Sequence, residues 1–591
     1  MSAFVAVPLA SLSPAAGSAA PGHRARGWRV RWGLAGILAV AAANWLLWAS
    51  AVPFGEAPDE PSHLEVAQFI AAQGRLPVFG PTGDMYVRLD QVGIPIESHA
   101  LAPPLPYLVD GALIRLGLAA PVAAARFGSL VAALVALALL YRLTARLLPA
   151  RPALALAAVA LVAAVPEVSF LAAVVNSDIF ALAAALAVAC LWPRVERLWG
   201  ALAFGLVLGL ALLTKYTTYP VVLLGLAVAG WQIGRQPARV GARLGRLALV
   251  ALGAGLVAGP WLVHNWHLYG EPWPLRLSEA AFRALQPPVP VPGAPGTQQP
   301  LSLAYAASWW QVTFRSFWAG FGRVDLFPPD WTYVLLLVGL AGGGLGLWRA
   351  AARRTLDSLS AEGRGAEWWF LVGWPLVVGL AVFVASLGRY YPAHGRYLLA
   401  ALPPLAVGLV LGWYHAAPPR WRLFAPWGLV AAMAAFNLYC LLGVVLPHYY
   451  GPAAARIVVT VDTPRPGDLV AAAVPVRGWA VVVGRDRWAP GRVGGAPAWY
   501  APAAAVQVTV DDAMSSPPRG GTGVPRPDLA RALEAPGVLH AGFEYWWEPR
   551  DATPGVRTLT VCASAPAAAT VCVPVPVRVA VAGAVETGSG R

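Results

Sequence analysis

Long runs of apolar residues constrain this chain most, because a helix of about 20 mostly apolar residues is long enough to cross a bilayer. On this criterion we expect eleven membrane-spanning helices, at 32–53, 121–141, 152–171, 178–193, 199–214, 216–233, 247–264, 331–348, 367–387, 397–414 and 423–446. Only 12% of the residues are charged, against about a quarter in soluble domains. A polytopic membrane protein is therefore expected. Nucleic acid is excluded as a partner despite the net charge of +14, since the arginines form no continuous stripe.

Arginine clusters give the orientation. They precede the first run and follow the second, fourth, sixth, eighth and tenth, beginning at Arg24, Arg142, Arg194, Arg235, Arg349 and Arg420. Cytoplasmic loops carry the excess of basic residues, so all six clusters lie on one side if the N-terminus is cytoplasmic. The sequence thus predicts a multi-pass protein of the cell (inner) membrane whose C-terminus lies on the periplasmic or extracellular side.

Three regions follow from this pattern. We expect a disordered, basic cytoplasmic N-terminus at 1–31 and a membrane domain at 32–447 with long outer loops at 54–102 and 265–330. Residues 103–119 are expected to form an interfacial helix. From 448 to 591, alternating apolar runs between Pro/Gly turns predict a small all-β sandwich.

The sequence does not decide whether two cysteines of the β-sandwich are bonded to each other. Cys562 and Cys572 fall on two successive predicted strands, where a hairpin would place them opposite each other. The exported side is oxidising, so a disulfide and two free thiols are both compatible with the sequence.

The segment PDEPSH (58–63) is the first candidate for chemistry. Pro58 and Pro61 restrict the backbone around the paired carboxylates Asp59 and Glu60. An apolar interface raises the pKa of a carboxyl group, which would suit a general base. The alternative is that Asp59 simply caps an amphipathic helix.

Two further candidates lie on the same predicted outer side. Asp178 belongs to the segment NSD (176–178), whose alternative is a cap for the next helix. Lys215 is the only lysine among 43 basic Lys and Arg residues, and an ammonium at the end of a span is a suitable partner for phosphate. The alternative for Lys215 is a side chain that extends to the interface.

Aromatic-rich segments at 264–273, 316–325 and 389–397 are weaker candidates, since aromatic belts are general at membrane interfaces. However, these segments and the earlier candidates together place several ionisable groups at one membrane face, which an aromatic belt alone does not explain. The convergent set comprises Asp59, Glu60, His99, Asp178, Lys215, His264 and Arg396.

The order of these segments resembles the GT-C superfamily of polyprenyl-phosphate-sugar glycosyltransferases, which includes protein mannosyltransferases and aminoarabinose lipid A transferases. The pieces are PDEPSH, SHALAPPLPY (98–107), NSD, LTK (213–215), NWHLYGEP (265–272) and HGRY (394–397). They cover most of residues 30–450. The C-terminal sandwich is similar to immunoglobulin-like modules, with RPD (526–528) and GF (542–543) among the shared pieces.

The resemblance implies an inverting glycosyltransferase that moves a sugar from a polyprenyl-phosphate donor to a cell-envelope acceptor (glycan, lipid or protein) at the outer face. It assigns Asp59 as catalytic base, with Glu60 and Asp178 as further catalytic carboxylates. The residues expected to bind the donor phosphate are Lys215, Arg396, His264, Asn265 and Tyr269. The other site candidates are His63, His99, Tyr107, Asn176 and His394.

Two departures from the family pattern leave the cofactor open. His264 stands where relatives often have arginine, and the histidine expected before PP is displaced to His99. Members differ in whether they need a divalent metal, so the metal ligands are unknown at this level. The competing class is a transporter or lipid-linked-sugar flippase, which would have internal repeats and charges at mid-membrane.

Overall fold

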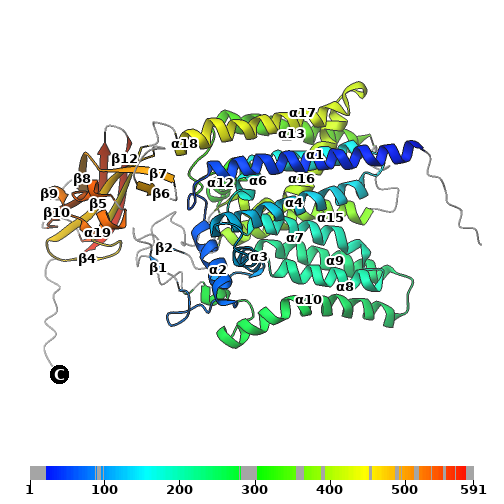
Figure 1. The fold of residues 1–591 in the computed structure, drawn as a ribbon, viewed down its shortest axis with the longest axis horizontal. Coiled ribbons are helices and arrows are strands. Elements are labelled where there is room, and N and C mark those ends of the chain that lie inside the picture. Colours follow the sequence, from blue (N-terminus) through cyan, green and yellow to red (C-terminus); the bar gives the residue numbers. More distant parts are fainter. Residues whose placement is uncertain are drawn as a thin grey trace, which may run out of the picture.

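The computed structural model describes residues 21–86, 88–89, 95–96, 99–278, 280, 302–353, 365–387, 393–450, 455–485, 491–493, 496–510, 518–533, 535–549, 554–565 and 568–580. Long helices lie side by side in one bundle, and a β-domain sits at one end of it (Figure 1). The N-terminal end of α1 lies at the opposite end of the bundle (Figure 1). The class expected from the sequence, a polytopic α-helical membrane protein followed by a small all-β domain, is confirmed.

The bundle consists of helices that, apart from α12 and α18, coincide with the predicted apolar runs. They are α1 (Pro21–Ala51), α4 (Pro121–Leu147), α5 (Pro152–Ala164), α6 (Pro166–Ala172), α7 (Asp178–Leu191), α8 (Leu198–Leu212), α9 (Tyr219–Arg235), α10 (Val240–Tyr269), α12 (Leu303–Ala319), α13 (Asp330–Ala352), α15 (Gly365–Leu387), α16 (Leu402–Ala416), α17 (Phe424–Tyr439) and α18 (Leu446–Tyr450). Among the described residues, eight helices are long and apolar enough to cross a membrane, or nine if a bent pair counts as one span.

The bent pair explains one difference from the sequence pattern. The run 152–171 was expected to be a single helix, but α5 and α6 meet at 67°. Pro166 opens α6, and a proline inside a helix removes a backbone donor and clashes with the preceding turn. Two other predicted spans are short helices, since α7 has 14 residues and α8 has 15.

Helix α1 begins earlier than expected. Residues 21–31, taken from composition as part of a disordered N-terminus, are helical, and that prediction is wrong for them. The prediction for residues 1–20 lies outside the described residues. The interfacial segment forms helix α3 (Leu105–Arg115). The segment 265–330, expected to be a loop, includes the end of α10 and the whole of α12.

Several short elements lie at the end of the bundle that faces the β-domain (Figure 1). Helix α2 (Glu60–Gln73) follows α1 after a short turn and packs on α3. The segment 54–102 also contains β1 (Arg88–Leu89) paired with β2 (Pro95–Ile96) and the 3-10 turn η1 (His99–Leu101). Two further 3-10 turns, η3 (Tyr216–Thr218) and η4 (Gly395–Ala401), lead into α9 and α16.

The C-terminal region folds into two sheets. One has the order β6-β7-β5-β10-β9 with β3 also paired to β5, and the other has the order β4-β12-β11-β8. The strands are β3 (Arg456–Thr463), β4 (Leu469–Val470), β5 (Val474–Arg485), β6 (Gly491–Val493), β7 (Ala496–Pro502), β8 (Ala505–Val510), β9 (Arg519–Val524), β10 (Gly542–Trp547), β11 (Gly555–Ala565) and β12 (Ala568–Val579). A short helix, α19 (Pro527–Ala532), lies between β9 and β10.

The core of this domain comes from the inward faces of both sheets. Val482 and Phe543 from one sheet pack in one cluster with Leu559 and Val577 from the other. Packing of the inner faces of two sheets against each other is the arrangement of a β-sandwich. On the β11–β12 hairpin Cys562 lies opposite Cys572, and the two form a disulfide, which resolves the alternative that the sequence left open.

Candidate active site

Asp59 occupies the N-cap position of α2 in an unusual backbone conformation. Its φ of 60° places it in the left-handed region, which aspartate tolerates better than most residues. Its side chain makes no capping hydrogen bond to the helix. The interpretation of Asp59 as an ordinary helix cap is therefore wrong, because the strained turn directs the carboxylate away from the helix backbone.

Asp59 instead faces Arg396 on η4. Arg396 Nη2 donates to Asp59 Oδ2 at 2.6 Å, and Nη1 lies 3.5 Å from the carbonyl oxygen of Pro58. Burial on its own would raise the pKa of Asp59, but the charge of Arg396, followed by those of His99 and His63, holds this pKa well below its ordinary value. The raised pKa expected from the sequence is wrong, since the cationic partner outweighs the apolar surroundings.

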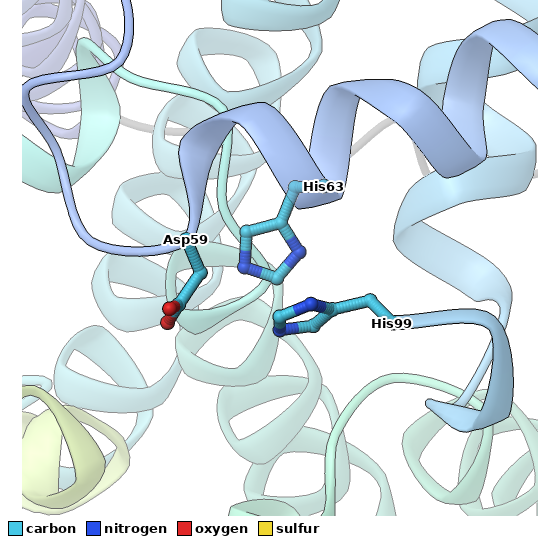
Figure 2. Close-up of side chains that lie close together, drawn as sticks. All are labelled: Asp59, His63 and His99. Carbon is cyan, nitrogen blue, oxygen red and sulfur yellow. The ribbon is translucent and has the colours of Figure 1, made fainter. Parts of the chain in front are cut away.

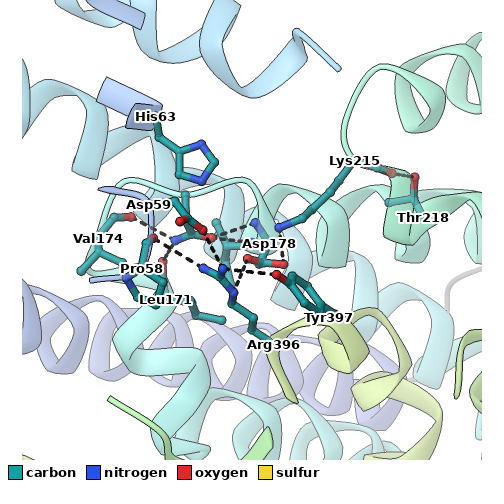
Figure 3. Close-up of polar contacts among 12 residues, drawn as sticks. Pro58, Asp59, His63, Leu171, Val174, Asp178, Lys215, Thr218, Arg396 and Tyr397 are labelled. Carbon is teal, nitrogen blue, oxygen red and sulfur yellow. Dashed lines mark hydrogen bonds and ion pairs between the residues drawn. The ribbon is translucent and has the colours of Figure 1, made fainter. Parts of the chain in front are cut away.

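Asp178 and Lys215 form a second ion pair beside the first (Figure 3). Lys215 Nζ donates to Asp178 Oδ1 at 2.7 Å, while Asp178 Oδ2 lies 4.0 Å from Arg396 Nε. Asp178 is only 1% exposed, and burial lowers the pKa of Lys215, with the charge of Asp178 partly offsetting it. Lys215 thus extends into a charge cluster, which disagrees with the interpretation that it extends to the interface.

The cap of α7 is made by a different residue. Asn176 Oδ1 accepts from the backbone N–H groups of Asp178 and Ile179, and its amide nitrogen donates to the carbonyl of Leu171. This removes the capping alternative for Asp178, whose carboxylate is free to engage cations. Asn176, a predicted site residue, has a positioning role here.

Tyr397 joins the two ion pairs and was not among the predicted site residues. Its ring lies 5.5 Å from Lys215 Nζ and 5.2 Å from the guanidinium carbon of Arg396. Cations near an aromatic face gain electrostatic stabilisation. Its position directly after Arg396 in HGRY was the signal available in the sequence.

Glu60 points into a separate, structural cluster. It is fully buried and accepts hydrogen bonds from Arg126 Nε, Arg126 Nη2 and the backbone N–H groups of Gly55 and Val175. Arg126 also donates to the carbonyls of Ala49 and Val52. These contacts tie α2, α4, the end of α1 and the segment after α6 together. Glu60 therefore positions its neighbour Asp59, and its expected catalytic role finds no support in this geometry.

His63, His99 and Asp59 form a compact group (Figure 2). The two imidazole ring centroids lie 4.1 Å apart, and one ligating atom from each of the three residues falls within 4.8 Å of the others. His63 Nδ1 is 2.9 Å from the hydroxyl of Tyr107, which is itself buried. The structure thus brings His63, His99 and Tyr107, three of the candidate residues from the sequence, together with Asp59.

Four other predicted residues lie around this centre in different ways. His394 stacks on Tyr397 with ring centroids 5.5 Å apart, and burial, reinforced by the charge of Arg396, lowers the pKa of His394 to about 3. Asn265 donates to the carbonyl of Pro272, and the Tyr269 hydroxyl accepts from the N–H of Phe79. His264 is half-buried on α10, outside the hydrogen-bonded cluster. Asn265 and Tyr269 therefore hold loops in place and do not join the charged group.

Two charged residues near the site, one part-buried and one buried, were missed by sequence reasoning. Arg126 and Glu167 are isolated charges inside apolar runs, and such residues are functional candidates by default. Glu167 is buried and accepts from the N–H of Gly320, which joins α6 to the end of α12. Both serve to link helices around the site.

The charge cluster contains two cations that an anion could bind in place of their present partners. Two cations, Arg396 and Lys215, are matched by two carboxylates, Asp59 and Asp178. Arg396 Nε and Asp178 Oδ2 are buried without a hydrogen-bond partner among the described residues. A phosphate that took over Arg396 would gain charge-assisted hydrogen bonds and would release Asp59.

Two comparisons with known proteins found similarities. Residues 102–264 match a family model described as dolichyl-phosphate-mannose-protein mannosyltransferase. Two crystal structures of ArnT from Cupriavidus metallidurans are similar, one bound to undecaprenyl phosphate and one in the apo state. Their identities are 17% and 18%, their TM-scores 0.41 and 0.42, and the match covers 70% and 71% of this chain.

These matches cover only parts of the proteins compared. The chain covers 64% of each ArnT chain, just under two thirds. A search of curated proteins gave no match. The family match spans residues 102–264, less than a third of the chain, and lies within the region whose segments resemble the GT-C superfamily in sequence.

Proposed function

We propose, from the GT-C family of its membrane domain, that this protein transfers a sugar from a polyprenyl-phosphate donor to a cell-envelope acceptor at the outer face of the membrane. The observation that carries the proposal is the buried group in which Arg396 binds Asp59 while Lys215 binds Asp178. Such buried charge pairs are costly unless function requires them.

The donor phosphate is assigned to the two cations. Arg396 offers an unpartnered Nε beside the Nη2 that now binds Asp59, which together match two phosphate oxygens. Lys215 supplies a point charge on the Asp178 side. Both cations would stabilise the charge that develops on the phosphate as the sugar leaves.

Asp59 is assigned as the base. In the structure its Oδ2 is held by Arg396 at 2.6 Å, so the phosphate and the carboxylate compete for one guanidinium. Donor binding would therefore free Oδ2 to take the proton of the acceptor hydroxyl as that oxygen attacks the anomeric carbon. The bond from the anomeric carbon to the phosphate oxygen breaks with inversion, and the phosphate leaves with the electron pair.

The outer side of the membrane is assigned to the end of the bundle that carries these residues. Arg146, at the C-terminal end of α4, pairs with Glu367 at 2.8 Å and donates to carbonyls at the C-terminal end of α7. Asp178 lies at the other end of α7. The predicted cytoplasmic arginine and the charge cluster thus mark opposite ends of one helix, which supports an exported site and an exported β-domain.

The proposal is tested by transfer from defined polyprenyl-phosphate sugars to envelope acceptors, with purified protein in liposomes. Arg396→Met should lower transfer strongly, whereas Asp84→Asn, which removes an exposed pair with Arg75 in the same outer segment, should leave it unchanged. The competing flippase would move the lipid-linked sugar across the bilayer and leave the phosphate–sugar bond intact. Flipping without transfer would refute the proposal.

A further inference from the structure

Asp59 belongs to a second group besides its ion pair with Arg396. With His63 and His99 it forms a set of side chains that can act as metal ligands. Two imidazoles from α2 and η1 lie beside one carboxylate (Figure 2). His99 Nδ1 is buried without a hydrogen-bond partner among the described residues. This unpartnered nitrogen of His99 lies next to a second imidazole and a carboxylate, and three such groups together can coordinate a metal cation.

The spacing of the three ligand atoms is close to that of a metal site. They lie within 4.8 Å of one another. Zinc–nitrogen bonds of about 2.0–2.1 Å put the ligands of a tetrahedral site about 3.4 Å apart. Side-chain rotations that bring the ligand atoms closer by up to about 1.4 Å would therefore complete the site.

Supporting contacts already orient two of the ligands. Tyr107 holds His63 Nδ1 at 2.9 Å, which leaves Nε2 as the ligand atom, and such partners fix the ring of a metal-binding histidine. Arg396 occupies Asp59 Oδ2, so Oδ1 is the oxygen we assign to the ion. One carboxylate oxygen can then bind the ion while the other remains available for a proton.

We propose that Asp59, His63 and His99 bind one divalent transition-metal ion of the zinc type. Two imidazoles and one carboxylate favour zinc over magnesium, which prefers oxygen ligands and octahedral geometry. Three protein ligands leave an open position, as in catalytic sites. Any part that the ion plays in sugar transfer rests on the proposed function, whereas its binding does not.

The test is metal binding by the full chain in detergent, without any donor or acceptor. Protein stripped with chelator is reloaded with Zn²⁺, dialysed and analysed for metal content, with His63→Asn and His99→Asn as variants. His267→Asn is the matched control, because His267 is exposed on α10. The wild type and His267→Asn should retain one Zn²⁺ per chain, even with tenfold excess Mg²⁺.

Each ligand variant should bind Zn²⁺ at least 100-fold more weakly, and Tyr107→Phe should cost about 10–100-fold as the loss of an orienting partner. X-ray absorption of the zinc-loaded wild type should count two imidazole ligands, which tests the site even if a variant fails to fold. No retained zinc in the folded wild type, equal zinc in the ligand variants, or a spectrum without two imidazoles would overturn the proposal. Zinc bound without sugar transfer would refute the proposed function alone, and transfer by zinc-free protein would refute only a role for the ion.

Discussion

Replacing Glu60 with glutamine should destabilise the protein far more than replacing its neighbour Asp59 with asparagine. Glu60 is 0% exposed and accepts four hydrogen bonds, two from Arg126 and two from backbone N–H groups. In Glu60→Gln one acceptor oxygen becomes an NH₂ group that faces existing donors. Arg126 then keeps a buried charge without its counter-ion.

The magnitude follows from this geometry. Breaking a buried ion pair by removing one partner costs about 3–5 kcal/mol. We therefore expect Glu60→Gln to lower the free energy of unfolding by that amount, and the melting temperature by at least about 5 °C. In Glu60→Gln/Arg126→Met the loss should be smaller than the sum of the two single losses, because the uncompensated charge is gone.

Unfolding of the membrane domain can be followed with the cysteines of the protein itself. Cys190 and Cys440 are buried free thiols, whereas the other two cysteines are bonded to each other, so a thiol-reactive dye reports unfolding of the membrane domain. Asp84→Asn, which breaks an exposed ion pair, is the control and should not move the melting temperature. A melting temperature for Glu60→Gln equal to that of the wild type would refute the structural role of Glu60.

Three further predictions concern other parts of the molecule. Lys215→Met should weaken the use of the polyprenyl-phosphate donor while the protein still folds, and Lys215→Arg should rescue it partly; unchanged donor dependence in transfer assays would contradict this. Reporters fused after Arg591 should be active only in forms that work outside the cytoplasm, and a cytoplasmic signal would overturn the orientation. After denaturation, alkylation should modify two cysteines without reductant and four with it; four in both cases would exclude the bond between Cys562 and Cys572.

Helix positions could be predicted from the sequence because a lipid-crossing helix must be apolar along its whole length. Each of the eleven runs coincides with helix in the structure. Hydropathy carries no information on bends, so the break between α5 and α6 was missed although Pro166 marks it. Composition in turn overestimated disorder at residues 21–31, where the arginine-rich end of α1 is helical.

The candidate site could be predicted only as a set of residues, because partners in the fold lie far apart in the chain. Arg396 meets Asp59 across 337 positions, and Arg126 meets Glu60 across 66. A single sequence places charges on one membrane face but does not say which pairs form. This is why Asp59 and Glu60, adjacent in sequence, could not be told apart until their partners were known.

The backbone turn at Asp59 was equally hidden. Pro58 and Pro61 indicated a restricted segment, but a φ of 60° at a non-glycine residue depends on tertiary contacts. That turn separates two roles, since Asp59 reaches Arg396 while Glu60 reaches Arg126. The expected raised pKa of Asp59 failed for the same reason, as Arg396 was not known to be its neighbour.

The central claim, that Asp59 is the base of a sugar transfer, is tested most directly by the transfer rate of Asp59→Asn. The assay uses purified protein in liposomes with a defined polyprenyl-phosphate sugar, and saturating Zn²⁺ in every sample so that metal occupancy is equal. General-base catalysis is worth about 10²–10⁴-fold, so the rate should fall by that factor. The melting temperature should stay nearer that of the wild type than in Glu60→Gln, because the Asp59 side chain is 32% exposed, asparagine keeps an acceptor oxygen for Arg396, and Arg396 retains Asp178 at 4.0 Å as a counter-ion. Transfer by Asp59→Asn at the wild-type rate would contradict the account and leave Asp178 as the next carboxylate to test.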